Sequence, residues 1–445
     1  MHRSLTIILC LLAPTWMTAC ETGDSSESDP VDISVSDGIG GGVDAAGPEI
    51  GGAPELPPAP VCPDPTGNRP MRRSEHAGIY DPVGDQVVIY GGTVAVPENC
   101  SFPTPTFESQ TWIYEPECNV WREVSGASPG GRNRHMTVYD AANHRMILFG
   151  GRYRSGESGP YTLYNDLWAF DLSTETWSQI SVQGQSPLPR MVGSLVYDPT
   201  GHRLILFGGN TSTSGMAYEA QSDLWTFDLS TDTWQILSAT GQGPTDRLFA
   251  AAIWDDTRQR MILTGGADNS AFFNDAQYFE DLWVLDMSGA LPKWMRVDDP
   301  SSPHPDGRFW GALVLDAPRD RYLMFGGHDD GDLGNRNDLW AYHPSQASWE
   351  LIQQGDTWNK PANGQCDFPP DFTNVDYDAP ERRSAHVFVA GGDAAWLMAG
   401  KTDCGVADDL VRLDLNDHTW DDVTPATVGV SCLRKGGLNC HDLCL

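Results

Sequence analysis

Short apolar runs alternate with polar turns along most of the chain, and the pattern is clearest between residues 190 and 236. After Arg190, a first apolar run ends in a turn at residues 198–202, and a second run stops at Gly208-Gly209. A polar stretch then leads to two further runs, one opening at Asp223 and the other carrying Trp234. Short runs bounded by Asp, Pro, Gly and Ser predict strands, so this unit predicts a four-stranded antiparallel sheet. Such a sheet cannot bury both of its apolar faces alone, so copies have to stack.

The unit recurs six times in register. Its second glycine lies at Gly92, Gly151, Gly209, Gly266 and Gly327, at intervals of 57 to 61 residues, and a degenerate sixth copy has Ala399-Gly400. An arginine opens every copy, 18 residues before the first glycine in five of them: Arg73, Arg132, Arg190, Arg247, Arg308 and, in the sixth, Arg383. Two tryptophans close five of the copies, as Trp225 and Trp234 do, while the last keeps Trp420 alone.

These marks resemble the kelch repeat, in which a double glycine ends the second strand and spaced aromatic residues follow. The resemblance covers residues 73–423 and implies an all-β fold: a six-bladed kelch-type β-propeller with four antiparallel strands in each blade. Strands a to d would then run from the hub outwards. The long connections between strands b and c would all emerge on one face, which we call the long-loop face. Because binding sites usually lie on loops held by a rigid scaffold, we expect the site there.

The amino-terminal residues predict export. Residues 1–19 carry Arg3 and then a short apolar run, as a signal peptide does, and Met17-Thr18-Ala19-Cys20 resembles a bacterial lipobox. That resemblance implies lipid attachment at Cys20, and Glu21 after it favours an outer-membrane lipoprotein of the bacterial cell envelope; ordinary secretion is the alternative. Residues 20–61 are acidic and rich in Gly, Pro and Ser, which predicts a disordered tether. Residues 62–72 form a lead-in and residues 424–445 a cysteine-containing tail.

The charge balance limits the class of partner. The chain has 28 basic and 61 acidic residues, a net charge of −33, or 27 − 61 = −34 once Arg3 is removed with the signal peptide. Such a charge disfavours nucleic acid and anionic membrane surfaces, so we expect membrane contact through the lipid anchor only. We expect a monomer that binds an acidic protein or glycan ligand.

Eight of the ten cysteines remain for pairing once Cys10 is cleaved off and Cys20 is lipidated, and they gather near the ends of the repeat array: Cys62, Cys100, Cys118, Cys366, Cys404, Cys432, Cys440 and Cys444. An exported chain with an even number of cysteines predicts disulfides. Their positions suggest that the bridges fasten the seam where the first and last blades meet. Zinc binding by the tail is the alternative, although the tail lacks the usual C-x-x-C spacing.

The six repeat arginines are the candidate ligand-binding residues. They open strand a, so they should surround the channel mouth on the long-loop face, where they can hold a ligand carboxylate. The alternative is that aspartates opening strand c neutralise them: Asp166, Asp223, Asp281, Asp338 and Asp409. The first copy has Thr111 in place of this aspartate, which makes Arg73 the candidate for an unpaired guanidinium.

Two patterns raise the question of a metal. His76, His135 and His386 each stand three residues after a repeat arginine, and they either converge on a metal or pack between blades. The segment 329–335 has a weak likeness to a calcium loop, but Gly334 occupies a ligand position. We expect the histidines to pack between blades, as Arg-x-x-His does in many kelch strands without a metal. The predicted site contains no metal and no cofactor.

No catalytic motif emerges from the sequence. Some kelch propellers are enzymes, namely copper-radical sugar oxidases, nitrile-forming specifier proteins and a periplasmic sialic-acid mutarotase. The specifier loop is matched by Glu219 and Asp223, but Phe227 replaces its histidine. We therefore expect a binding scaffold with no catalytic residues, and we keep a sugar-processing enzyme as the alternative.

Overall fold

Each copy of the repeat folds into one antiparallel sheet whose strands follow sequence order. In the computed structural model, blade 1 contains β1 (Ala77–Asp81), β2 (Gln86–Tyr90), β3 (Thr111–Glu115) and β4 (Val120–Val124). Blade 2 contains β5 (Met136–Asp140), β6 (Arg145–Phe149), β9 (Leu167–Asp171) and β10 (Thr176–Ile180). Blade 3 contains β11 (Ser194–Asp198), β12 (Arg203–Asn210), β13 (Ala220–Asp228) and β14 (Thr233–Ile236). The prediction of four strands in each blade is confirmed.

The second half of the ring repeats this plan with one variation. Blade 4 contains β15 (Ala251–Asp255), β16 (Arg260–Thr264), β17 (Leu282–Asp286) and β18 (Lys293–Arg296). Blade 5 contains β19 (Ala312–Asp316), a 3-10 turn η1 (Ala317–Arg319), β20 (Arg321–Phe325), β21 (Leu339–His343) and β22 (Ser348–Gln353). In blade 6, β23 (Arg383–Ser384) and β24 (Val387–Gly391) both pair with β25 (Ala394–Thr402), followed by β26 (Gly405–Asp414) and β27 (Trp420–Asp422).

The structure describes residue 62 and residues 67–94, 104–215, 217–273, 275–329, 334–356, 379–402 and 405–425. All of them belong to the unit Pro60–Leu445. The predicted signal peptide, the lipid-attachment residue Cys20 and the tether lie outside the described residues. In the described part, no helix combines the length and the apolar character needed to cross a membrane.

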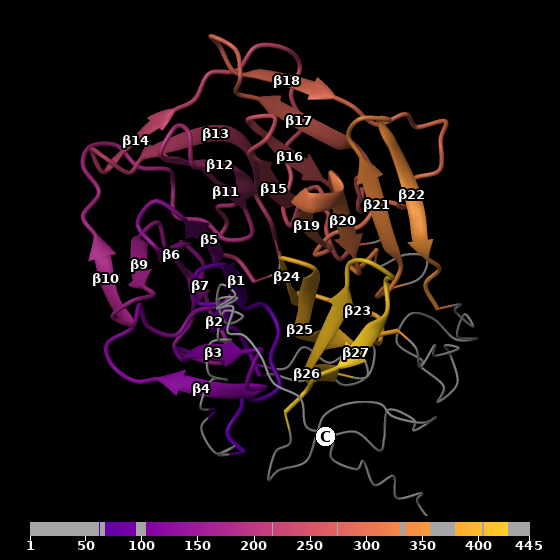
Figure 1. Cartoon of the computed structure of the whole chain (residues 1–445). Coiled ribbons are helices and arrows are strands. Elements are labelled where there is room, and N and C mark those ends of the chain that lie inside the picture. The colour runs from indigo at the N-terminus through magenta and orange to yellow at the C-terminus, as the bar shows by residue number, and fades with distance from the viewer. Residues whose placement is uncertain are drawn as a thin grey trace, which may run out of the picture. The chain divides into compact units, whose positions relative to one another are not determined.

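The six sheets stand around a common axis with β1, β5, β11, β15, β19 and β24 innermost (Figure 1). The core is divided among the junctions between blades. Between blades 2 and 3, for example, Phe149 and Leu206 belong to one buried apolar cluster. The closing junction is built in the same way, since Trp112 of blade 1 and Trp396 of blade 6 share a cluster. The six-bladed propeller is therefore confirmed.

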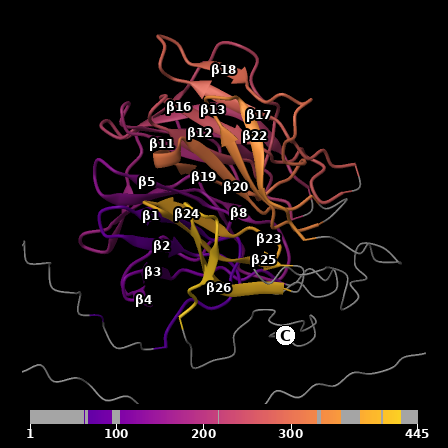
Figure 2. The ribbon, with the colours of Figure 1, turned by 45° about the vertical axis from the view of Figure 1, so that its right-hand side comes forward.

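No strand is exchanged at the seam, and β1 and β24 lie side by side there in Figure 1 and Figure 2. The rings of Tyr80 and Trp396 stack across it, with centroids 5.0 Å apart. The lead-in crosses the seam as well, because Arg69 donates to Asp408 at 2.8 Å and to the carbonyl of Pro425 at 3.2 Å. An ion pair and a backbone contact thus connect the lead-in to blade 6.

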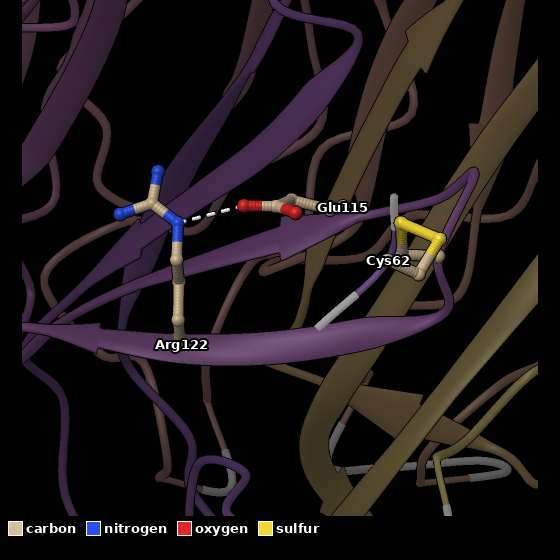
Figure 3. The surroundings of a disulfide bond; sticks show 4 residues. Cys62, Glu115 and Arg122 are labelled. Carbon is tan, nitrogen blue, oxygen red and sulfur yellow. Dashed lines mark hydrogen bonds and ion pairs between the residues drawn. A yellow bond between two sulfur atoms is a disulfide. The ribbon is translucent and has the colours of Figure 1, made fainter. Parts of the chain in front are cut away.

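One disulfide lies in the described part, and it joins Cys62 of the lead-in to Cys118 in the β3–β4 turn (Figure 3). It fixes the lead-in to blade 1, next to the pair that Arg122 forms with Glu115 at 2.7 Å. The predicted bridges of the remaining six cysteines lie outside the described residues. For Cys62 and Cys118, the bond connects the lead-in to its own blade, and the described contact with blade 6 comes from Arg69.

Blade 6 departs from the predicted loop pattern. The sequence analysis predicts a long connection between strands b and c in every blade, but here β25 continues to Thr402 and β26 begins at Gly405. The two strands extend their ladder beyond the glycine position, with Lys401 paired to Val406. The long connections therefore belong to blades 1 to 5, and in blade 2 the connection carries a small ribbon of β7 (Arg152–Tyr153) and β8 (Thr162–Leu163).

Candidate functional site

Five of the repeat arginines form the same buried latch inside their blades. Arg132 illustrates it: Nη1 donates to the carbonyl of Gly150 at 3.0 Å, and Nη1 and Nη2 grip Asp166 at 2.7 and 3.0 Å. The indole N–H of Trp168 donates to the same carboxylate at 2.8 Å. The other four pairs are Arg190–Asp223, Arg247–Asp281, Arg308–Asp338 and Arg383–Asp409. A tryptophan indole completes the latch in blades 2 to 5.

These latches join the start of strand a to the start of strand c, and the aspartates neutralise the charge of the guanidiniums. The five arginine side chains are at most 1% exposed. A bidentate ion pair satisfies both charges at once, which is what burial of a guanidinium requires. The pairing with strand-c aspartates, offered as the alternative in the sequence analysis, is therefore what the structure contains.

Arg73 is the exception, although for a slightly different reason than predicted. The residue equivalent to Asp166 is Gln110, not Thr111: Gly91 N–H donates to the carbonyl of Gln110 as Gly150 N–H donates to that of Asp166. The tryptophan spacing agrees, because Trp112 follows Gln110 by two positions as Trp168 follows Asp166. Thr111 instead accepts a hydrogen bond from the indole of Trp177, in blade 2.

Arg73 keeps the backbone half of the latch and lacks the carboxylate. Its Nη1 donates to the carbonyl of Gly91 at 3.1 Å and its Nε to that of Met71, while no described carboxylate forms a salt bridge with it. It is 1% exposed. Burial lowers the pKa of Arg73 to about 10, against the through-space attraction of Glu108 and Glu123. This guanidinium is held in the same place as the others but is incompletely compensated.

A second ring of residues surrounds the axis at the long-loop face. It consists of the residues two positions after each arginine: Glu75, Arg134, Val192, Phe249, Trp310 and Ala385. All six have φ between 51° and 59°, a left-handed conformation that is rare for bulky side chains. Each blade holds the next in this conformation, as when Arg134 N–H donates to the carbonyl of Glu75 and Val192 N–H to that of Arg134. We call the opening inside this ring the channel mouth.

One side of the channel mouth is charged. Arg134 donates to Glu75 through Nε at 2.9 Å and Nη2 at 2.8 Å, and Arg152 donates to the same carboxylate at 3.2 Å. Burial alone would raise the pKa of Glu75, but the attraction of Arg134 and Arg152 outweighs it and lowers that pKa to about 2. Burial, and then the neighbouring Arg134, lower the pKa of Arg152 to about 10. Two guanidiniums therefore share one carboxylate, which leaves a local surplus of positive charge.

The opposite side is aromatic. The rings of Phe249 and Trp310 contact each other with centroids 4.3 Å apart. The guanidinium of Arg134 lies 4.9 Å from the ring centroid of Trp310, within the range of a cation–π contact. Tyr218 and Phe272, from the b–c connections of blades 3 and 4, pack on the same aromatic cluster. An apolar wall beside a small charged group is the usual composition of a ligand site.

Below the mouth, Glu75, Arg134, Phe249 and Trp310 line a cavity of about 150 Å³ that continues down the axis. His76, His135 and His386 lie along the same cavity, and all three are buried. Their rings pack between blades, as His135 does against Tyr90 with centroids 5.5 Å apart. Burial, followed by Arg132 for His135 and by Arg383 for His386, lowers the pKa of each of these two to about 3. The structure therefore supports the packing role of these histidines.

Neither candidate metal site is supported by the described residues. Among them, no group of three or more His, Cys, Asp or Glu side chains is arranged to hold a metal ion. Asp329 of the weak calcium loop accepts from Gly334 N–H at 2.7 Å and from Arg336 at 2.6 Å. Residues 330–333 of that loop lie outside the described part.

The residues of the channel mouth were missed in the sequence. The sequence analysis predicted the constant arginine of each copy as the ligand-binding residue. In five copies, that arginine instead holds the blade together. The signal was present two positions later, where the six copies differ in size, charge and polarity although the arginine before them is constant. Arg152 directly follows the glycine pair of its copy and carried no separate signal.

A comparison with known families gives the fold a name. The family model described as the KLHDC2/KLHL20/DRC7 Kelch-repeats domain matches residues 61–199 and 156–368, which is more than half of the chain. The chain belongs to the kelch-repeat family. The solved structure titled "Structure of YjhT" is similar to this kelch propeller with a TM-score of 0.55 and 15% identity, over 81% of this chain and 99% of that one. At that identity, the likeness concerns the fold alone.

Several longer proteins are similar to this chain over part of their length. The Leucine-zipper-like transcriptional regulator 1 homolog of Drosophila melanogaster is 26% identical over 331 residues, covering 74% of this chain and 29% of that protein. The Acyl-CoA-binding domain-containing protein 4 of Arabidopsis thaliana is 26% identical over 295 residues, covering 66% of this chain and 40% of that protein. The chain thus spans less than half the length of both relatives.

Proposed function

We propose that this kelch propeller is a non-enzymatic binding scaffold that holds a carboxylate-bearing ligand, from a protein or a glycan, at the channel mouth. The observation that carries the proposal is the local charge: Arg134 and Arg152 share the single carboxylate of Glu75. A ligand carboxylate would supply the missing acceptor. The chain has a net charge of −33, so a local excess of positive charge sets the channel mouth apart from a protein that is acidic as a whole.

The aromatic wall supports the same proposal. Phe249 and Trp310 offer ring faces to a sugar ring or a peptide side chain, and Tyr218 extends them from a b–c connection. Aromatic residues and arginine are enriched at sites that dominate binding energy. The five latched repeat arginines have no part in this site, so the binding role predicted for them is now assigned to their neighbours Arg134 and Arg152.

We further propose that the protein is displayed at the bacterial cell envelope through a lipid on Cys20. This part rests on residues 17–20 of the sequence alone. Membrane fractions of cells expressing the Cys20→Ser variant should lose the protein to the soluble or unprocessed pool. Unchanged membrane fractionation of that variant would refute the anchor.

A ligand array tests the binding proposal. Purified protein should retain acidic peptides or uronic and sialic sugars, and reject their amidated or neutral counterparts. Arg152→Gln should weaken binding at least about tenfold, because a charge-assisted hydrogen bond is worth roughly 1.5–3 kcal/mol. Arg412→Gln is the matched control, since Arg412 lies on β26 and pairs only with surface aspartates.

Three outcomes would contradict the proposal. Equal binding by Arg152→Gln and by the unaltered protein would exclude the channel mouth. Retention of neutral and acidic ligands alike would exclude the carboxylate. Turnover of a bound sugar, or near-stoichiometric copper or iron in the purified sample, would favour the sugar-processing enzyme instead.

A further inference from the structure

Blade 1 contains the donors of a latch without its acceptor. In blades 2 to 5, an aspartate accepts from two guanidinium nitrogens and from an indole N–H, as Asp223 does from Arg190 and Trp225. In blade 1, the indole nitrogen of Trp112 is buried and has no hydrogen-bond partner in the described structure. Arg73 likewise lacks a carboxylate. Of two donors that meet on one carboxylate in four other blades, the indole here has no partner and the guanidinium donates only to the carbonyls of Gly91 and Met71 among the described residues.

The donors have the positions that their counterparts have. The hydrogen bond from Arg73 to the first glycine of its pair measures 3.1 Å, against 2.9 to 3.2 Å in blades 2 to 5. Trp112 pairs with Ile89 on strand b, as Trp168 pairs with Leu148. The backbone of blade 1 therefore holds Trp112 and Arg73 at the positions that their counterparts have in the other blades.

Gln110 stands at the aspartate position and does not act as an acceptor. Its backbone accepts from Gly91 N–H, but its side-chain oxygen is buried without a hydrogen-bond partner. A longer amide side chain carries no charge, and here its oxygen accepts a hydrogen bond from neither donor. The substitution of a carboxylate by this amide leaves the guanidinium and the indole available to another acceptor.

The equivalent carboxylates are partly exposed to solvent. Their exposed fractions are 20% for Asp166, 35% for Asp223, 13% for Asp281 and 12% for Asp338, although the arginines behind them are almost fully buried. A group at this position is thus open on one side. Glu108 and Glu123 lie near enough to act on Arg73 through space, so the position disfavours a multiply charged anion such as phosphate and favours a single carboxylate.

We propose that Arg73 and Trp112 form a carboxylate-binding slot in blade 1, filled by an aspartate or glutamate side chain of a partner protein. The ligand carboxylate takes the position that Asp166, Asp223, Asp281 and Asp338 hold in their blades. A slender CH₂ link suits this position, because in the other blades the carboxylate is carried by the short side chain of aspartate. This slot lies between strands a and c of one blade and goes beyond the binding proposed at the channel mouth.

The probe is N-acetyl-aspartyl-N-methylamide, which presents one aspartate carboxylate, and its asparagine analogue is the control. Nuclear magnetic resonance of the full-length protein reports on the indole N–H of Trp112, assigned with a Trp112→Phe variant. We expect the aspartate probe to move this resonance downfield in a saturable way and the asparagine analogue to leave it in place. Equal shifts with both probes would overturn the proposal.

A variant that fills the slot with a carboxylate of the protein itself provides the decisive test. Gln110→Asp installs the carboxylate of the other blades, so it should weaken binding of the probe at least about tenfold while the protein stays folded with an equal or higher Tm. The reciprocal Asp166→Gln should create a second slot in blade 2 and a second shifting indole resonance, that of Trp168. Undiminished probe binding by Gln110→Asp would refute the slot. Arg152→Gln should not affect this signal, so failure of the slot and failure of the channel-mouth proposal can be told apart.

Discussion

The two halves of the ring use one backbone plan for opposite chemistry. In blades 6, 1 and 2, the second and third residues after the repeat arginine are Ala385 and His386, Glu75 and His76, and Arg134 and His135. In blades 3, 4 and 5, they are Val192 and Gly193, Phe249 and Ala250, and Trp310 and Gly311. The first half is polar and the second apolar, although φ at the second residue is nearly the same throughout. The scaffold therefore fixes where these side chains stand and leaves their chemistry free.

Acid should separate the two halves most strongly. His135 and His386 have folded-state pKa values of about 3, and that of His76 is also lowered, first by burial. The unfolded state binds protons near pH 6.5 while the folded state does not, so stability is full above that pH and is lost as the pH falls toward 3. Three such groups lower the free energy of unfolding by about 4 kcal/mol per pH unit once the pH is well below 6.5.

Denaturant unfolding at pH 7, 6 and 5 measures this slope. The double variant His135→Gln, His386→Gln should reduce the contribution of the three histidines to about one third. A slope that does not change in the double variant would mean that these imidazoles are already protonated or solvated in the folded state.

Loss of a latch should lower the free energy of unfolding by the same amount in both halves. Asp166→Ala in the polar half and Asp281→Ala in the apolar half each leave a buried guanidinium unpaired, and breaking such a pair typically costs about 3–5 kcal/mol. Gln110→Ala, at the equivalent position of blade 1, removes no ion pair and should change the free energy of unfolding little. A large difference between the two aspartate variants would show that the latch depends on the chemistry around the axis.

Reduction of the Cys62–Cys118 bond should weaken the polar half first. The bond closes a separation of 56 residues, for which the chain-entropy model gives about 4 kcal/mol as an upper value. Because the lead-in also holds blade 6 through Arg69, amide protection should fall in blades 1 and 6 before blades 3 to 5. Hydrogen exchange with and without reductant checks this order, and a uniform loss of protection would contradict it.

The smallest effect is expected in the apolar half. Phe249→Leu keeps an apolar side chain and removes no hydrogen bond, but it ends the contact of the ring with the Arg134 guanidinium, so it should cost about 1–2 kcal/mol. In the polar half, Arg134→Met should cost more, because it removes the bidentate partner of Glu75. Thermal unfolding of the pair at pH 7 makes the comparison, and equal costs would mean that Glu75 is adequately held by Arg152 alone.

Much of the fold could be read from the sequence because the signals were local and repeated. The glycine pairs have φ values that only glycine adopts easily, as at Gly208 and Gly209, so they marked the end of strand b in each copy. Alternation around them defined the strands. The bidentate partners of the arginines also followed from spacing, since Asp166 and its equivalents recur at the start of strand c.

The site was harder to predict from the sequence, because it depends on residues that come together only when the blades pack against one another. Glu75, Arg134 and Arg152 come from two blades and from two separate positions in the repeat. The sequence analysis aligned Thr111 with the aspartates, although the spacing to Trp112 marks Gln110 as the equivalent residue. The extended hairpin of blade 6 was missed because the pairing of Lys401 with Val406 replaces a loop without any turn motif that marks it.

The seam has a consequence for the history of the chain. Every blade is completed by strands that follow one another in sequence. The ring therefore does not require the polypeptide to start and stop at this particular seam. Duplication or loss of one copy of the repeat would add or remove a whole blade without orphaning a strand. The number of blades is then limited by how many wedge-shaped sheets fit around the axis, and the amphipathic opening at its centre can be redrawn by changing two side chains at a time.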